Sequence, residues 1–261
     1  MSDGNTILSV AKAMELLGVL GRAQGALTLK ELSERCGFPK STVFGLLTTM
    51  REYDVISQTP DGKYALGLRL FELGCLVEKS LDISNVAKPY MELLSQKTGA
   101  SVMLSICQGA NVITLDQVQP HGNLHVVSST GARLPIHCTS QGKVFLAYRK
   151  RQDAQRLLQR LTLDAFTPHT LTDVPALMQE LDAARENGYA IENGEYKIGL
   201  RSISAPVFTQ SGEVKYTVGV IGMFRSVHSD EFAAAIEQVK ATASMISAAL
   251  GYRPDRELNI M

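Results

Sequence analysis

The sequence has no net charge, no long apolar run and no closely spaced pair of cysteines. Its 261 residues carry 26 basic and 26 acidic side chains, so the basic surplus common in DNA-binding proteins is absent. No stretch approaches the roughly 18 apolar residues of a membrane span, and no basic-then-apolar export signal stands at the N-terminus. We therefore expect a cytoplasmic protein, away from membranes, built of one large domain or two ordinary ones.

The sequence also lacks the spacings that hold metals or disulfides. There is no C-x-x-C, and reduced, partly buried thiols are expected at Cys36, Cys75, Cys107 and Cys138. His121 and His125 are four residues apart, which would suit a metal on a helix. Pro120 and Gly122 beside them predict a loop instead. We expect no metal and no cofactor.

Motifs of catalysis are missing as well. The chain has no G-x-S-x-G elbow, no glycine-rich phosphate loop and no metal triad. His137 precedes Cys138, and Ser140 follows closely, so a nucleophile can be imagined. Adjacent residues of an extended segment point apart, however, and no acid is placed to orient the histidine. We do not expect an enzyme.

The first 40 residues predict two helices and a tight turn. Ser9 can cap a helix, and Gly21 and Gly25 bracket its end. Its apolar positions at helical spacing are Val10, Ala13, Met14, Leu17 and Leu20. Thr28 and Glu31 have the form of a capping box, and the short helix they open runs to about Cys36, where Gly37 ends it.

Pro39 is suited to the first turn of a further helix. The apolar stripe of this helix is Val43, Leu46, Leu47 and Met50, and its opposite face is small and mostly hydroxylic: Ser41, Thr42, Gly45, Thr48 and Thr49. Two short helices joined in this way match a helix-turn-helix, although any small helical hairpin would give the same pattern.

Residues 55–66 favour the helix-turn-helix over a simple helical hairpin, because they predict a β-hairpin. Pro60, Asp61 and Gly62 occupy their preferred positions in its turn. A two-stranded wing directly after a recognition helix makes a winged helix-turn-helix, and Lys63 at the wing tip can meet a phosphate. We expect residues 1–80 to bind double-stranded DNA.

The remainder predicts an antiparallel α+β domain. Strands are expected near 101–107, 111–118, 124–128, 201–208 and 214–224. Helices are expected over 83–98, after Ser140, over 152–161 and 175–187, and from Phe232 to Leu250. Because side chains alternate along a strand, one sheet face is aliphatic and the other is small and mixed in polarity. The mixed face is either solvated or lines a cavity, and the long insertion over 131–199 favours a cavity.

A turn rich in glycine and proline delivers Thr139 or Ser140 to the start of an apolar helix. The first backbone N–H groups of a helix lack partners and can hold an anion. This segment is therefore the best candidate for a ligand site.

Three segments resemble the IclR family of bacterial transcription regulators: residues 131–147, residues 188–208 and, less closely, residues 32–47. The resemblance implies a winged helix-turn-helix domain over 1–80. It implies a linker helix within 66–79 and a GAF-like or profilin-like effector domain over 81–261. It further implies a repressor, more than an activator, of a catabolic operon, acting as a homodimer or a dimer of dimers.

The recognition helix departs from the family pattern. Lys40, Ser41 and Thr42 match it, but Gly45 stands where the family commonly has arginine. Readout then shifts to neighbours such as Phe44, which can touch a thymine methyl or pack against the preceding helix. The candidate DNA contacts are Thr28, Lys40, Ser41, Thr42, Phe44, Gly45, Thr48 and Lys63.

The effector residues of the family also transfer by position. The backbone amides of Ser140 and Gln141 would grip a carboxylate, while two hydroxyl positions on the last strand are lost at Gly219 and Ile221. The effector implied is an organic acid with an aromatic or aliphatic portion rather than a compact C2–C3 oxo-acid. The candidate contacts are Met103, Ser140, Gln141, Glu192, Ser202, Ser204, Gly219 and Ile221.

Two alternatives stay open at this point. Glu195 and Arg201 lie in the same signature, and a structural ion pair explains them as well as ligand contact does. The second domain could also serve protein–protein assembly alone, with no small ligand.

Overall fold

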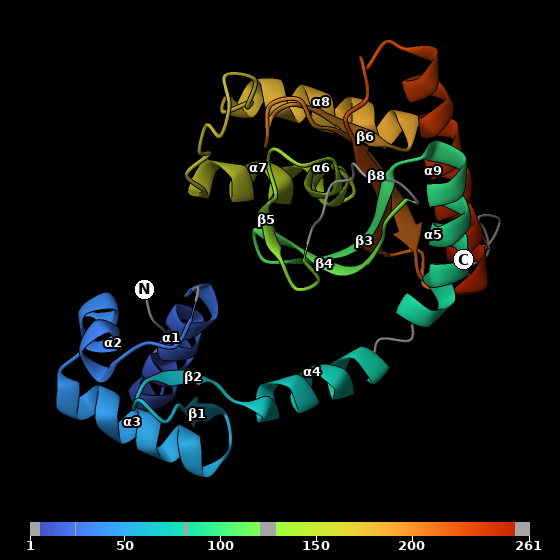
Figure 1. The fold of residues 1–261 in the computed structure, drawn as a ribbon. Helices are drawn as coiled ribbons and strands as arrows, with labels where there is room; N and C mark the ends of the chain where they lie inside the picture. The colour runs from blue at the N-terminus through green and yellow to red at the C-terminus, as the bar shows by residue number, and fades with distance from the viewer. Residues whose placement is uncertain (1–5, 24, 81–82, 121–128, 254–261) are drawn as a thin grey trace, which may run out of the picture. The chain divides into compact units, whose positions relative to one another are not determined.

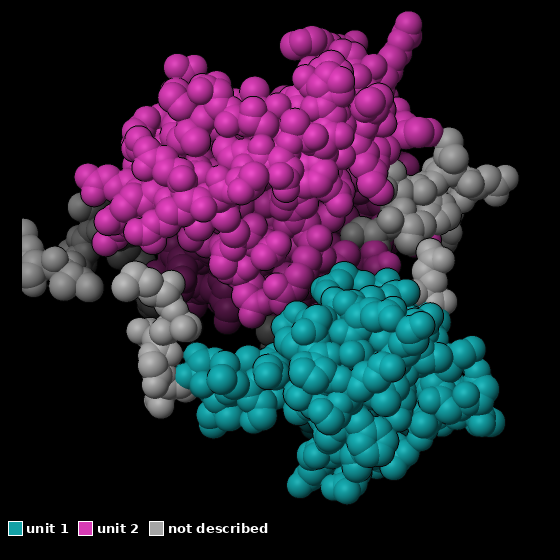
Figure 2. All heavy atoms as spheres, turned by 90° about the vertical axis from the view of Figure 1, so that its left-hand side faces the viewer, with its two compact units in different colours: residues 1–81 teal, residues 82–261 magenta. Residues whose placement is uncertain are grey.

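The computed structural model describes residues 6–23, 25–80, 83–120 and 129–253. The chain divides into two compact units, Met1–Leu81 and Asp82–Met261, which Figure 2 colours separately. No helix within the described ranges is both long and apolar enough to cross a bilayer.

The first unit is built of three helices, a two-stranded wing and a connecting helix (Figure 1). Its elements are α1 (Leu8–Arg22), α2 (Leu29–Cys36), α3 (Lys40–Glu52), β1 (Ile56–Gln58), β2 (Tyr64–Leu66) and α4 (Leu68–Ser80). The predicted capping box is confirmed, since Thr28 and Glu31 bond reciprocally. Gly37 ends α2 with a φ of 67°, a conformation that glycine adopts without strain.

The core of this unit confirms the stripe of α3 and corrects that of α1. Val43, Leu47 and Met50 are buried as predicted. In α1 the predicted Val10 and Met14 are exposed, and Leu16 and Val19 are buried instead. Apolar residues stand on two sides of α1, and packing against α2 and α3 selects one side, which the sequence pattern does not indicate.

Two helix starts also differ from the prediction. Helix α1 begins at Leu8 with Ile7 before it, so Ser9 lies inside the first turn and does not cap it. Pro39 is the residue before α3 rather than its first member, with an extended ψ of 141°. Both differences are of one or two positions, the usual uncertainty of a helix end.

The described part of the second unit is a six-stranded antiparallel sheet between two layers of helices. Its strands lie in the order β5-β4-β3-β8-β7-β6. They are β3 (Ser101–Gln108), β4 (Asn111–Val118), β5 (Arg133–Pro135), β6 (Ala190–Asn193), β7 (Arg201–Phe208) and β8 (Val214–Gly222). Helices α5 (Ile83–Thr98) and α9 (Asp230–Ala249) cover one face, while α6 (Ser140–Ala147), α7 (Arg151–Arg160) and α8 (Val174–Asn187) lie on the other side (Figure 1).

The register confirms the two predicted sheet faces. Val102 pairs with Val220 on the aliphatic face, which packs under α5 and α9. Met103 pairs with Gly219, and Gly219 pairs in turn with Ser204, on the face that meets α6. The mixed face is therefore covered and not solvated.

The strand prediction was incomplete. Strands β5 and β6, of three and four residues, were missed, and β8 ends at Gly222, two residues earlier than expected. The strand expected over 124–128 falls outside the described residues. Such short strands are held by pairing with β4 and β7, so their own residues give little signal.

Candidate DNA-binding helix and ligand cavity

The N-terminus of α3 combines free backbone donors with a cation. The residue before it, Pro39, gives no side-chain cap, and the first turn holds no acidic residue. Lys40 is exposed and, in the described part of the chain, has no carboxylate within 4 Å. Unpaired N–H groups at a helix start attract phosphate, and a cation beside them adds to the attraction.

The outward face of α3 agrees with the predicted small polar surface. Phe44 is 54% exposed, so it does not pack against the preceding helix and remains available for a base edge. A Cβ built at Gly45 meets no atom within 4 Å, so the protein's own packing does not require glycine there. The Thr48 hydroxyl donates to the Phe44 carbonyl at 2.9 Å and keeps its acceptor capacity for a ligand.

Two other candidate contacts are already engaged within the protein. Thr28 accepts from the Glu31 amide at 3.2 Å and donates to its carboxylate at 2.8 Å. Lys63 lies 2.8 Å from Asp61, and the hydrogen bonds of that carboxylate to Lys63 and Thr59 lower its pKa to about 2. Asp61 thus offsets part of the charge of the wing cation, and α3 is the better candidate surface.

In the second unit, a cavity of about 240 Å³ opens between the mixed sheet face and the start of α6. Five predicted effector residues line it: Met103, Gln141, Glu192, Ser202 and Ile221. Its wall is completed by Ser129, Ala132, Arg133, Leu134, Thr139, Tyr196, Lys197 and Leu200. The sequence pattern gave no signal for Arg133 and Lys197. Arg133 begins the short strand β5 and Lys197 lies in the loop after β6, and only the fold brings the two to one cavity.

Ser140 and Ser204 are not part of that wall. The Ser140 hydroxyl is fully buried and lies 2.8 Å from the Ser204 hydroxyl and 2.9 Å from that of Ser202. Ser202 donates in turn to Glu192 at 3.1 Å. This chain of hydroxyls joins α6 to β7 and β6 behind the cavity, so any contact of Ser140 with a ligand must use its backbone.

Gly219 has a packing role. A Cβ there would collide with the Ser204 hydroxyl and the carbonyl oxygen of Ile203. Glycine at this position therefore makes room for the hydroxyl chain; it is not simply a lost donor. Ile221, the other predicted substitution, does place its side chain in the cavity wall.

The first turn of α6 presents unused amides to this region. Thr139 caps the helix by accepting from Gly142 N at 3.3 Å, and it donates to the Pro135 carbonyl at 2.9 Å. Among the described residues, no partner is found for the N–H groups of Ser140 and Gln141. A Cβ at Gly142 would collide with the Ile136 carbonyl, so glycine allows α6 to start this close to the preceding strand segment.

Electrostatically, the cavity suits a single negative charge. Among the described residues, the exposed Arg133 and Lys197 line it together with one carboxylate, that of the buried Glu192, and one nitrogen of Arg133 also donates to Gln108 at 3.1 Å. Burial raises the pKa of Glu192, while hydrogen bonds from the Tyr196 amide and Ser202 act against that rise. A raised pKa reduces the negative charge that Glu192 places opposite an anionic ligand.

Lys143 is a site residue that the pattern reading missed. It is 1% exposed in a helix whose every member is buried, and its ammonium pairs with Glu195 at 2.6 Å and with Glu180. Burial raises the pKa of Glu195, and Lys143 opposes the rise. A lysine inside an apolar helix was the available signal, because such a charge needs a buried partner. The pair ties α6 to the loop that carries Tyr196 and Lys197.

The possible ion pair between Glu195 and Arg201 does not form. Glu195 is paired with Lys143, and Arg201 donates to the Phe224 carbonyl at 2.6 Å. The possible nucleophile also loses support. Burial raises the pKa of Cys138 to about 12, and the ring nitrogen of His137 contacts the Asp164 carbonyl at 3.1 Å.

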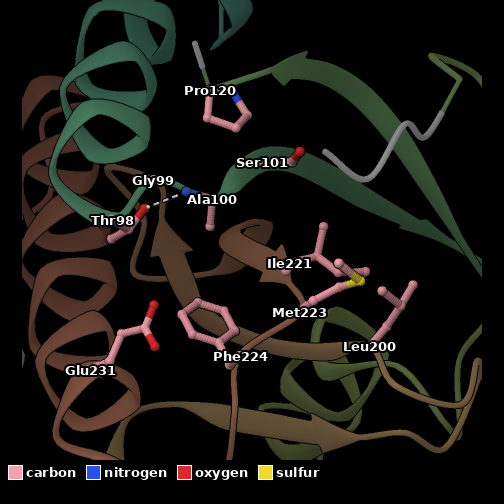
Figure 3. Close-up of a pocket in the computed structure, with 11 residues that line it drawn as sticks. Thr98, Gly99, Ala100, Ser101, Pro120, Leu200, Ile221, Met223, Phe224 and Glu231 are labelled. Atoms are coloured by element: carbon pink, nitrogen blue, oxygen red, sulfur yellow. Dashed lines mark hydrogen bonds between the residues drawn. The ribbon is translucent and has the colours of Figure 1, made fainter. Parts of the chain in front are cut away.

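A second hollow of about 340 Å³ adjoins the first, with Leu200 and Ile221 on both walls. Figure 3 shows these two side chains beside Met223, with Phe224 and Glu231 farther along the same hollow. The side chains of Leu200 and Ile221 therefore set how far the ligand cavity extends in this direction.

Comparisons with known proteins agree with this architecture. Residues 9–60 match the IclR helix-turn-helix domain, and residues 75–248 match the domain described as bacterial transcriptional regulator IclR C-terminal. The HTH-type transcriptional regulator XynR of Escherichia coli (strain K12) is 33% identical over 247 residues, covering 94% of this chain and 98% of that protein. The HTH-type transcriptional repressor AllR of the same strain is 28% identical and covers 94% and 91%.

A solved structure gives the same result for the fold. The crystal structure of an IclR transcriptional regulator from Alicyclobacillus acidocaldarius superposes with a TM-score of 0.82 at 28% identity, covering 94% of this chain and 100% of that one. Both relatives are named as regulators of transcription and not as enzymes. With both family domains matched over most of its length, the chain belongs to the IclR family of bacterial transcriptional regulators.

Proposed function

We propose that this regulator represses a catabolic operon and that a small monocarboxylic acid bound beside α6 controls its grip on the operator. The observation that carries the proposal is the cavity at the start of α6. There, among the described residues, Gln141 with its free backbone amide and the cations Arg133 and Lys197 line the same space as a single buried glutamate, next to the free amide of Ser140. A repressor role is in line with the similarity to AllR, which is named a repressor.

The cavity argues for the size of the acid. Its 240 Å³ is below the roughly 300–1,000 Å³ of sites for drug-sized ligands, so the acid must be compact. Met103, Leu134, Leu200 and Ile221 give it an apolar wall beside the polar end. An aromatic or branched aliphatic acid covers this apolar wall better than glyoxylate or pyruvate, which have little apolar surface to place against it.

Calorimetric titration of the full chain with benzoate, 4-hydroxybenzoate, glyoxylate and pyruvate tests the proposal. We expect the aromatic acids to bind at least tenfold more tightly than the two oxo-acids. Tight glyoxylate binding without any response to bulkier acids would overturn the size argument.

The variant Gln141→Pro tests whether the backbone N–H of Gln141 binds the carboxylate of the acid. Proline is tolerated in the first turn of a helix, and at Gln141, the second residue of α6, it removes the N–H together with the glutamine side chain. The matched control is Gln141→Ala, which removes the same side chain and keeps the N–H. We expect the proline variant to bind the acid at least tenfold more weakly than the alanine variant. Equal affinities would exclude a role for this amide.

Binding to DNA is tested through Lys40. We expect Lys40→Ala to weaken binding to all duplexes and to lower the slope of affinity against salt by about one charge. Lys30→Ala is the control, since Lys30 stands on α2, where its ammonium lies 3.9 Å from the Glu34 carboxylate. Unchanged operator affinity across salt in Lys40→Ala would remove the phosphate role of this residue.

A further inference from the structure

Apart from the effector cavity and the hollow that adjoins it, a larger cavity of about 750 Å³ lies at the other end of the sheet in the same unit. It is lined by Ile106, Cys107, Phe145, Tyr148, Arg149, Arg185, Phe208, Gly212, Glu213, Val214, Lys215 and Tyr252. The ends of β3 and β7 and the start of β8 form its floor, and the end of α6 forms one side. It shares no residue with the effector cavity, which meets the opposite ends of the same strands.

Among the described residues, three cations line this cavity together with one carboxylate, Glu213. In the part of the chain that the structure describes, no carboxylate lies within 4 Å of Arg149, Arg185 or Lys215. Like charges gathered without counterions repel one another, and an anionic ligand would relieve that cost.

The two arginines are held in place by neutral groups. One guanidinium nitrogen of Arg185 donates to the carbonyls of Ala147 and Arg149, both at 3.4 Å. One nitrogen of Arg149 lies 3.2 Å from the Gly109 carbonyl and 3.4 Å from the Cys107 sulfur. These contacts use a minority of the five donors of each guanidinium, so the rest remain available to a ligand.

We propose that this cavity is a second ligand site, for a small molecule that carries a diphosphate group. Two positioned guanidinium forks suit phosphate oxygens, and the net excess of two positive charges matches a diphosphate better than a single carboxylate. The volume falls within the range of small-molecule sites, and Tyr148 and Tyr252, which pack against Phe208, give the wall an apolar part beside the cations.

Helix α6 connects the two cavities. Its first turn lines the effector cavity. Phe145 in its last turn and Tyr148, the residue after it, line the larger cavity of about 750 Å³. The eight residues of α6 span about 12 Å. The inference does not depend on the proposed effector, because no residue of the effector cavity takes part in it.

The test is calorimetric titration of the full chain with ADP, with inorganic pyrophosphate and with adenosine. We expect ADP and pyrophosphate to bind and adenosine not to bind. Lys215→Gln and Arg185→Gln should each weaken ADP at least tenfold. Arg160→Gln, the same change on an exposed arginine of α7 outside the cavity, should leave the affinity unchanged.

If Arg185→Gln disturbs the fold, Lys215→Gln still tests the proposal. Among the described residues, the Lys215 side chain makes no hydrogen bond that this substitution would remove. A second control, Lys40→Gln, separates this site from the phosphate-attracting start of α3. No binding of ADP by the wild-type protein overturns the proposal. Binding that Lys40→Gln weakens and Lys215→Gln does not overturns it equally.

Discussion

Gly45 is a residue that packing within the protein does not explain. It stands in the middle of α3, exposed, and nothing in the protein occupies the space where a Cβ would be. Glycine inside a helix costs about 1 kcal/mol relative to alanine. Its presence in α3 is therefore not explained by the stability of this unit, and we propose that it allows a close approach to DNA.

We predict that Gly45→Ala raises the free energy of unfolding of the first unit by about 1 kcal/mol. Urea unfolding followed by circular dichroism measures it, and Leu47→Ala, a core truncation, identifies the transition that belongs to this unit. Gly67→Ala is the control, since a Cβ at Gly67 would collide with the Asp54 carbonyl and must lower the stability. A destabilised Gly45→Ala variant would show that the helix needs glycine for its own folding.

Glu192 is the residue at which pH should act. Burial raises its pKa above the ordinary value of 4.5, so its stabilising contribution is complete below that value. The contribution is lost as pH rises through the raised pKa, because the unfolded chain then gives up the proton more readily than the folded one.

We predict that Glu192→Gln, which mimics the protonated carboxyl, is more stable than the wild type at neutral pH, with the difference shrinking toward pH 4.5. Thermal melts across that pH range measure it. Ser226→Ala, in a loop away from the cavity, serves as a reference for general pH effects. A constant difference at every pH would show that Glu192 titrates normally.

Helix α6 is the element on which the ligand cavity depends. Its start is fixed by Thr139 and Gly142, and its centre is anchored by the buried Lys143 to Glu195 in the loop after β6. Removing one partner of a buried ion pair leaves the other charge uncompensated, which is more costly than removing both.

We predict that Lys143→Met lowers the free energy of unfolding of the second unit by about 3–5 kcal/mol. The double variant Lys143→Met with Glu195→Gln should recover most of that loss, and a double-mutant cycle from chemical unfolding measures the coupling. Additive effects of the two substitutions would contradict a shared buried pair.

Elements with local signals could be predicted from the sequence, and elements defined by distant partners could not. The capping box of α2, the stripe of α3 and the alternation along β3 are each defined by residues only a few positions apart in the sequence. Lys143 and Glu195 are 52 positions apart, and β5 and β6 exist only through their neighbours in the sheet. The family resemblance located the cavity, whereas its cations Arg133 and Lys197 required the fold.

At the scale of the whole molecule, α4 leaves apolar side chains without cover. Leu68, Phe71 and Leu76 are 71%, 69% and 58% exposed. Isolated exposed leucines are common, but a helix with a cluster of large apolar residues generally packs against a partner. We infer that this helix joins two copies of the chain, as the family resemblance implies.

We predict that Phe71→Asp shifts the protein toward the monomer and weakens operator binding, because two half-sites are then no longer held together. Sedimentation velocity measures the first effect and a gel-shift assay the second. Arg69→Gln, two residues away, changes the charge by the same amount without altering the apolar surface. An unchanged sedimentation profile for Phe71→Asp would rule out α4 as the joining surface.

The division of labour around the start of α6 has an evolutionary consequence. On the assignment proposed above, the acid group is held by main-chain amides, which no substitution short of proline removes. The remainder of the ligand meets side chains such as Met103 and Ile221, which can be exchanged one at a time. A lineage built on this scaffold would inherit its preference for acids while the identity of the acid drifts with each new catabolic pathway.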